Sequence, residues 1–219
     1  MRIHKEGHKI ILILSLILIS LNLGLYQVAS RTLLFYFVLG LSIGVFLIIL
    51  NFFRSPTRKF TGEIKNTVIA PADGTIVVIE EVMENEYFYD KRMQVSIFMS
   101  LFNAHVNWIP CNGKVIKSSH QNGRFIAAYL PKSSTENERS TIVIERENGE
   151  QILVRQIAGA MAKRIVTYSK PEQTCKINEQ LGFIKFGSRV DIFLPLGTDI
   201  KVKMDESVRG NKTVLAFLK

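Results

Sequence analysis

The sequence predicts a mainly β protein, in which a single compact β sandwich or barrel-like domain follows an N-terminal hairpin of two transmembrane helices. Two observations support this fold class. Apolar residues gather in two long runs near the N-terminus, and they raise the hydrophobic share to 47% and the mean hydropathy to +0.16. From Val68 onward, short β-branched and aromatic stretches alternate with turn signals instead of forming stripes of helical period.

The two apolar runs are the first elements of the chain. They cover residues 10–25 and 33–53, and the second has the length of about 20 residues that a helix needs to cross a bilayer. The short segment 26–32 between them makes a helical hairpin. The first run is short and contains polar residues, so a cleaved signal peptide is the alternative. Residues 27–29, Gln-Val-Ala, are a poor small-residue cleavage site, and this favours a retained hairpin.

Basic residues set the expected orientation of the hairpin. They precede the first span and follow the second, whereas only Arg31 lies in the turn, so both ends should face the cytoplasm from the inner membrane. Residues 1–59 contain seven Lys or Arg and one Glu, which is +6 of the total net charge of +9. This distribution argues against a nucleic-acid-binding protein and fits a flank that is attracted to anionic lipids, although topogenic charge alone would produce it.

A linker, residues 54–63, leads to the β domain, residues 64–219. Turn signals separate the apolar stretches of this domain, and residues 85–90 and 131–139 read as loops. Two cysteines without a CxxC motif indicate a reducing compartment and no structural zinc. The predicted strands are 75–79, 93–99, 114–118, 141–145, 151–154, 189–194 and 213–218.

The dipeptide Gly187-Ser188 is the first candidate for chemistry. A serine hydroxyl that attacks the carbonyl before it converts an amide into an ester, and glycine tolerates the backbone dihedrals that this requires. Elimination from the serine would then release residues 1–187 and leave a pyruvoyl group on residues 188–219. Gly-Ser is also common in turns, so the interpretation depends on other residues.

A self-cleaving serine needs a base, and two of the four histidines precede the first span. His105 lies in the apolar stretch 98–110, where its protonation can be tuned near neutral pH; a core histidine bonded to a backbone carbonyl is the alternative. His120 is the other candidate. Asp73, in the Pro-Ala-Asp-Gly turn at 71–74, is either an Asx-turn residue or the partner that orients a histidine.

Taken together and in their order along the chain, the segments described above resemble those of the phosphatidylserine decarboxylase family. The resemblance runs from residue 54 to 219 and includes the basic linker, the Pro-x-Asp-Gly turn, the histidine-bearing strand, Asn-Glu-Arg at 137–139 and the Gly-Ser pair. It is greatest to the short members with an N-terminal membrane hairpin. It implies an enzyme of phospholipid biosynthesis that decarboxylates phosphatidylserine to phosphatidylethanolamine.

The resemblance also implies residue roles. Asp73, His105 and Ser188 match the family's self-cleavage residues, and the pyruvoyl group derived from Ser188 would be the covalent cofactor and electron sink, with no metal. The two fragments would stay together as a heterodimer that acts on a membrane phospholipid. Longer members have two histidines here. His105 takes the first place and Trp108 the second, so His105 serves alone or together with His120.

Further site candidates come from two segments. Gly159, Ala160 and Met161 belong to a stretch that resembles the family segment lining the pyruvoyl group, where small residues let backbone N–H groups approach an oxyanion; a tightly packed strand is the alternative. Possible contacts to the lipid headgroup are Asn137, Arg139 and His120, although Arg139 could instead pair only with Glu138 or with solvent.

Two other classes of function remain open at this point. One is a membrane-anchored Ser/His/Asp hydrolase in which Ser188 acts repeatedly, although no Gly-x-Ser-x-Gly motif surrounds it. The other is a non-enzymatic, membrane-tethered β adaptor domain. The sequence predicts no nucleic-acid partner, and it leaves open a homo-oligomer as well as the backbone and acyl chains of a lipid substrate.

Overall fold

A computed structural model of the chain describes residues 2–30, 32–124, 126, 136–159, 164–185 and 187–219. The chain divides into two compact units, Met1–Thr57 and Arg58–Lys219. The first unit contains two helices and the second is built from β-sheets. The predicted fold class, mainly β with an N-terminal helical pair, is therefore confirmed.

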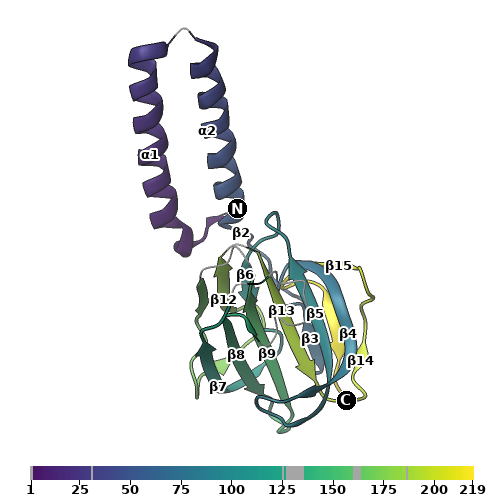
Figure 1. Ribbon diagram of the computed structural model, residues 1–219. Coiled ribbons are helices and arrows are strands. Elements are labelled where there is room, and N and C mark those ends of the chain that lie inside the picture. The colour runs from purple at the N-terminus through teal and green to yellow at the C-terminus, as the bar shows by residue number, and fades with distance from the viewer. Residues whose placement is uncertain (1, 31, 125, 127–135, 160–163, 186) are drawn as a thin grey trace. The chain divides into compact units, whose positions relative to one another are not determined.

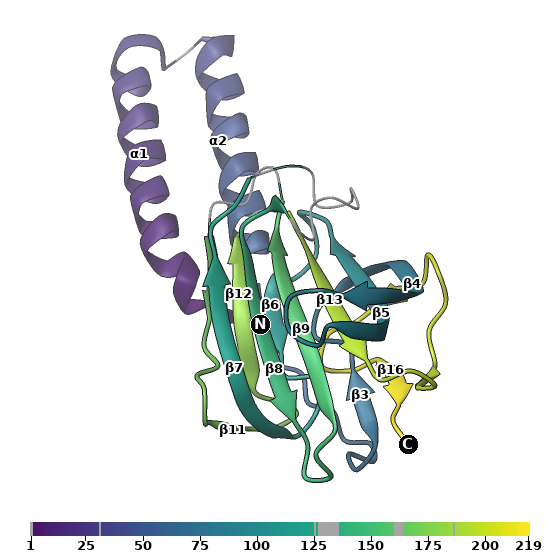
Figure 2. The same ribbon diagram turned by 60° about the horizontal axis from the view of Figure 1, so that its bottom comes forward.

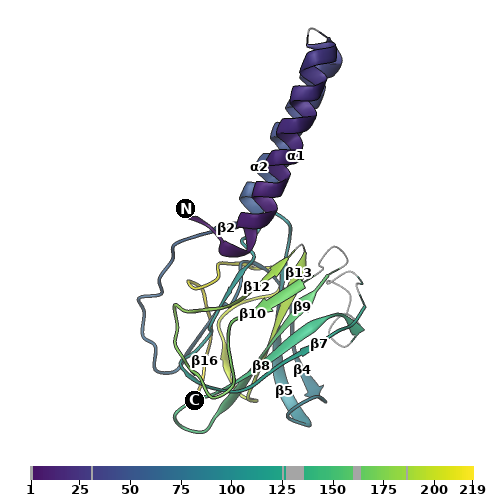
Figure 3. The ribbon, with the colours of Figure 1, turned by 90° about the vertical axis from the view of Figure 1, so that its left-hand side faces the viewer.

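The helical unit is a hairpin of two apolar helices. Helix α1, Lys5–Ala29, runs beside α2, Leu33–Phe52 (Figure 1, Figure 3). Both are long and apolar enough to cross a membrane, and almost none of their most apolar residues are buried by the protein itself. Such exposure would be unfavourable in water, so the helices indicate association with a membrane.

A short β-ribbon closes the hairpin at the ends opposite its turn. Strand β1, Arg2–Ile3, pairs antiparallel with β2, Arg54–Ser55. The His4 amide donates to the Phe53 carbonyl at 2.8 Å. A Cβ atom at Gly7 would lie only 2.5 Å from the Phe53 ring, so glycine is required for this close approach. The two ends are thereby held together, as the predicted hairpin requires.

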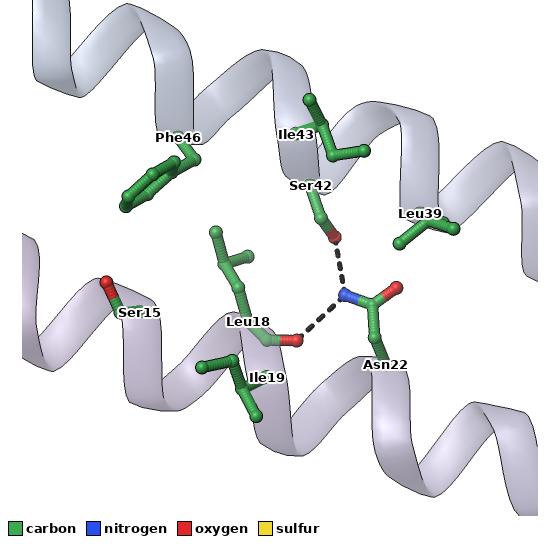
Figure 4. A pocket seen from close by; sticks show the side chains of 8 residues that line it. All are labelled: Ser15, Leu18, Ile19, Asn22, Leu39, Ser42, Ile43 and Phe46. Atoms are coloured by element: carbon green, nitrogen blue, oxygen red, sulfur yellow. Dashed lines mark hydrogen bonds between the residues drawn. The ribbon is translucent and has the colours of Figure 1, made fainter.

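A polar contact joins the helices near their middle. The Asn22 side-chain amide donates to the Ser42 hydroxyl at 2.9 Å and to the Leu18 carbonyl at 2.8 Å (Figure 4). It lies in an apolar groove of about 280 Å³ between the helices. Hydrogen bonds between membrane helices contribute about 0.6–2 kcal/mol. A polar residue that lowers the hydropathy of the first span therefore holds it to the second.

The described strands of the second unit form three antiparallel sheets. The large sheet has the order β11-β7-β8-β9-β13-β5-β4-β15, and the small sheets have the orders β10-β12-β6 and β14-β16-β3. The strands of the large sheet are β4 Gly74–Glu84, β5 Asp90–Met99, β7 Gly113–Gln121, β8 Arg139–Glu145, β9 Gln151–Ala158, β11 Thr174–Cys175, β13 Ser188–Leu194 and β15 Ser207–Val208. Those of the small sheets are β3 Thr67–Ile69, β6 Val106–Trp108, β10 Arg164–Thr167, β12 Gln180–Lys185, β14 Asp199–Ile200 and β16 Val214–Phe217.

The main core lies between the inner face of the large sheet and the two small sheets. Val154 and Val190 of the large sheet pack in one buried cluster with Ile184 of β12 and Leu215 of β16. The large sheet is curled, and β13 lies near its middle, between β9 and β5 (Figure 2). Strand β13 is consequently held by neighbours on both edges.

The outer face of the large sheet is also covered around β13. Phe193 packs there with Tyr87 and Phe88 from the connection between β4 and β5. Beside them lie buried charges, including the ion pair of Arg189 with Asp191 at 2.8 Å. Every residue of β13 is therefore buried, which explains its nearly continuous apolar character with two charged exceptions.

The predicted strands correspond to β4, β5, β7, β8, β9, β13 and β16. The unpredicted strands of this unit are short or contain Gly and polar residues, so they lack a clear alternating pattern; they are β3, β6, β10, β11, β12, β14 and β15. The predicted loop at 85–90 is a turn through residue 88, and Asp90 already belongs to β5. Most of the predicted loop 131–139 lies outside the described residues.

Glu84 should make the stability of the β domain depend on pH. Burial alone would raise the pKa of Glu84, but hydrogen bonds from the Phe88 and Tyr87 amides and from the Arg155 guanidinium hold that pKa below its ordinary value. A lowered folded-state pKa adds stability above the unfolded-state value of 4.5 and loses it as the pH falls through the folded-state value.

We therefore expect Glu84→Gln to lower the free energy of unfolding by about 2–3 kcal/mol at pH 7. The difference from the parent should shrink as the pH falls below 4.5. Urea unfolding in detergent, followed by the emission of Trp108, the only tryptophan, measures it; both proteins carry Ser188→Ala, which removes the hydroxyl of the predicted cleavage site. A difference that stays constant down to pH 3 would contradict this assignment.

Candidate active site

Gly187 and Ser188 form the entry to the central strand of the large sheet. Gly187 has a φ of +65°, in the left-handed region that favours glycine. Ser188 begins β13 and is fully buried. It pairs with Met99 at the end of β5 on one side and with Ala158 at the end of β9 on the other. The sheet thus fixes the serine in place on both edges.

The carbonyl that Ser188 would attack already has a hydrogen-bond donor. The Gly159 amide donates to the Gly187 carbonyl oxygen at 2.9 Å. A donor at this distance stabilises negative charge that develops on the oxygen during attack. A role of the Gly159 N–H toward an oxyanion stays a prediction. The two other predicted residues of this segment, Ala160 and Met161, lie outside the described residues.

Asn137 supports this donor. Its side-chain amide donates to the carbonyls of Ala158 and Ile126, both at 2.7 Å, and accepts from the Ile126 amide at 3.0 Å. The side chain is fully buried. The structure therefore uses Asn137 to hold the backbone next to Gly159, and these bonds engage both ends of the amide that was expected to contact a headgroup.

His105 is fully buried near the same end of the domain. Its Nδ1 atom lies 3.0 Å from the Asn103 carbonyl oxygen. A carbonyl can only accept, so Nδ1 carries the proton, and the neutral ring has its basic lone pair on Nε2. The His105 carbonyl accepts from Ile184 of β12, the strand that leads to Gly187. Within the described part of the chain, the Ser188 hydroxyl donates to Met99 Sδ at 3.3 Å and not to a histidine.

The hydrogen bonds of Asp73 go to residues other than His105 and Ser188. Its carboxylate forms a two-pronged ion pair with Arg58 and accepts from the Gly210 amide at 2.8 Å. The Arg58 guanidinium also lies 5.9 Å from the centre of the Trp108 ring. Among the described residues, Asp73 is thus bonded to Arg58 and Gly210 rather than to His105, and Asn103 supplies the contact that orients the imidazole.

The remaining headgroup candidates have partners on the protein. Arg139 pairs with Glu86 at 2.8 Å. His120 is partly exposed, and its Nε2 atom lies 3.5 Å from Glu138 Oε1. Strands β8 and β9 separate the strand of His120 from that of Ser188.

Two buried side chains near Ser188 had no role in the sequence analysis, the amide of Asn107 in β6 and the thioether of Met99 at the end of β5. A third, the fully buried amide of Gln156 in β9, opens the segment 156–161 that was expected to line the pyruvoyl group. The sequence signal of Asn107 was a polar residue at an inward position of an apolar strand, which has many structural causes. The two free cysteines offer no competing nucleophile, since burial raises the pKa of Cys175 to about 12 and that of Cys111 as well.

Comparison with known proteins gives consistent matches over the whole chain. The phosphatidylserine decarboxylase family profile matches residues 45–216. The phosphatidylserine decarboxylase proenzyme of Parabacteroides distasonis is 59% identical over 218 residues, which cover 100% of this chain and 99% of the relative. The proenzyme of Bacteroides fragilis is 56% identical, with coverages of 100% and 96%, and that of Cytophaga hutchinsonii is 50% identical, with coverages of 99% and 98%.

The Arg58–Asp73 ion pair should contribute to stability as a coupled unit. Arg58→Met leaves a nearly buried carboxylate without its cation, so we expect a loss of about 1–3 kcal/mol in the free energy of unfolding. Asp73→Asn should lower the free energy of unfolding by a similar amount. The double variant should be at least as stable as the less stable of the two single variants. Urea unfolding in the Ser188→Ala background tests this. Strictly additive losses would show that the pair is not coupled.

Proposed function

The chain belongs to the phosphatidylserine decarboxylase family, and we propose that it is a pyruvoyl-dependent decarboxylase that cuts itself between Gly187 and Ser188 and converts phosphatidylserine into phosphatidylethanolamine. The matched relatives are named proenzymes, which supports a processing step. The observation that carries the proposal is the hydrogen bond from the Gly159 amide to the Gly187 carbonyl, directly before a buried serine hydroxyl.

Cleavage begins when the Ser188 oxygen attacks the Gly187 carbonyl carbon. The C=O electron pair moves onto the carbonyl oxygen, where the Gly159 N–H stabilises it. When this pair returns, the C–N bond breaks, the nitrogen takes a proton, and an ester joins Gly187 to the Ser188 side chain. His105 is the proposed base, because its Nδ1–H is committed to Asn103 and Nε2 holds the basic lone pair.

The surroundings of Ser188 fit a group made from the chain itself. The serine is fully buried, which limits the access of water that would hydrolyse the ester before elimination. A pyruvoyl group at this position would supply the electron sink for decarboxylation. The matched relatives are named decarboxylase proenzymes, and this supports a decarboxylase over the alternative of a hydrolase.

The hairpin suits a substrate that stays in the bilayer. We propose that both ends of the hairpin and the β domain face the cytoplasm at the inner membrane, following the basic flanks of the spans. Of the predicted headgroup contacts, His120 is the one with substantial exposure, at 44% of its side chain. A direct role for Asp73 in cleavage remains a prediction, beside its ion pair with Arg58.

Intact mass spectrometry tests the cleavage. The purified protein should consist of residues 1–187 and of a fragment that starts at residue 188 and lacks an α-amine. Ser188→Ala should remain one chain, and His105→Ala should cut about 10²–10⁴-fold more slowly, the range typical of general acid–base catalysis. A wild-type protein that remains a single unbroken chain would refute the proposal.

The two fragments should stay together after cleavage. Strand β13 keeps its pairing with β5 and β9 because only the bond before it is cut. We expect the fragments to co-elute in detergent on size exclusion and to separate only in denaturant. Elution of residues 188–219 as a free peptide under native conditions would contradict the role of this strand pairing.

A further inference from the structure

A chain of buried polar side chains leads from Ser188 into the core. The Ser188 hydroxyl donates to Met99 Sδ at 3.3 Å, and the Asn107 Nδ2 atom lies 3.7 Å from the same sulfur. Gln156 Nε2 donates to Asn107 Oδ1 at 2.7 Å, and the Thr167 hydroxyl donates to Gln156 Oε1 at 3.0 Å. The chain thereby connects four strands, β5, β6, β9 and β10, to the first residue of β13.

This chain is unusual for its surroundings. Asn107 and Gln156 are fully buried, and the neighbouring inward residues Val190 and Ile165 belong to the apolar core. Replacing both partners of a buried hydrogen bond by apolar groups of the same shape can be neutral or stabilising, so stability alone does not require these amides. The fold also makes room for it: a Cβ atom at Gly182 would lie 2.8 Å from Gln156 Nε2.

The direction of every hydrogen bond in the chain follows from the sulfur. A thioether has no hydrogen, so Asn107 must turn its Nδ2 group toward Met99 and its Oδ1 atom toward Gln156. Gln156 must then donate through Nε2, and its Oε1 atom accepts from Thr167. Gln156 and Thr167 thus hold Asn107 with its N–H donors, not its carbonyl oxygen, facing the side of Ser188.

We propose that Asn107 is a catalytic residue in the second half of self-cleavage, with Gln156 and Thr167 as its positioning residues. This inference rests on the proposed function, because it concerns the ester that the first half produces. Met99 separates the Asn107 amide from the hydroxyl in the uncut chain, and an unbranched thioether moves easily. Once the ester has formed, the Asn107 N–H donates to the oxygen that was the Ser188 hydroxyl.

The donor acts where negative charge develops. A base removes the Cα proton of Ser188, the C–H electron pair forms the Cα=Cβ double bond, and the Cβ–O bond breaks with its electrons going to the Gly187 carboxylate. The N–H of Asn107 stabilises the departing oxygen as it gains this charge. The resulting enamine takes a proton on Cβ and loses one from nitrogen, which gives an imine. Water then replaces the nitrogen at Cα, ammonia leaves, and the keto group of the pyruvoyl remains.

Trapping of the ester tests this assignment. Asn107→Leu removes the donor at similar size, so the ester should form but eliminate about a hundredfold more slowly. We would synthesise the chain in a cell-free reaction with phospholipid nanodiscs, quench samples over time and treat them with hydroxylamine, which splits esters. The accumulated ester should yield residues 1–187 as a hydroxamate and a fragment that begins with an intact, amine-bearing Ser188.

Two results would overturn the inference: maturation of Asn107→Leu at the wild-type rate, or an uncut chain that resists hydroxylamine. Gln94→Leu is the matched control, because it removes a buried amide from the same sheet that bonds to Ser96, away from Ser188. It should mature without accumulating ester. If the wild type itself stays uncut, the proposed function fails; if the wild type matures and Asn107→Leu holds no ester, only this inference fails.

Gln156→Glu provides a second test, in which the size of the side chain is kept and only its hydrogen-bonding groups change. An ionised carboxylate only accepts, so both Thr167 and Asn107 would donate to it and Asn107 would turn its oxygen toward Met99. Burial raises the pKa of the introduced carboxyl, and its neutral form can donate as Gln156 does. Ester should therefore accumulate in Gln156→Glu as the pH rises and disappear as it falls. A pH profile identical to that of the wild type would overturn the positioning role.

Discussion

The fold and the chemistry both depend on one constraint, which is that strand β13 is hydrogen-bonded on both edges. Its first residue, Ser188, is paired with Met99 of β5 and with Ala158 of β9. The end of β9 brings the Gly159 amide to the Gly187 carbonyl. A central strand cannot shift its register without breaking two ladders, so the reacting hydroxyl and the carbonyl with its donor are held in one geometry.

The two faces of β13 are buried in different ways, and each needs its own compensation. On the outer face, Arg189 pairs with Asp191, while Arg155 is paired with Glu84. Charges removed from water in this way are tolerated because each has an opposite charge and hydrogen bonds. On the inner face, the polar chain through Asn107 and Gln156 crosses an apolar core. The buried charges and amides in and around this central strand therefore each have a hydrogen-bond or ion-pair partner close by.

The histidine and the aspartate have partners that the motifs did not predict. The His105 Nδ1 atom lies at the backbone carbonyl of Asn103, and the Asp73 carboxylate pairs with Arg58, while their joint role in cleavage stays a prediction. A backbone carbonyl leaves no mark on a sequence, because every residue has one. Arg58 is likewise invisible as a partner, since it lies fifteen positions from Asp73 and looks like one more basic residue after the second span.

Local sequence patterns are enough to predict the helical pair, the mainly β class, most strands of the large sheet and the Gly187-Ser188 pair, because apolar run length, alternating hydrophobicity and glycine chemistry are local properties. Which groups meet depends on the tertiary structure. Short strands such as β6 and β12 lack a pattern of their own, and they bring Asn107 and Gly182 to Gln156. Hydrogen bonds between residues distant in sequence depend on strand order and register, and these are set by the packing of the whole domain.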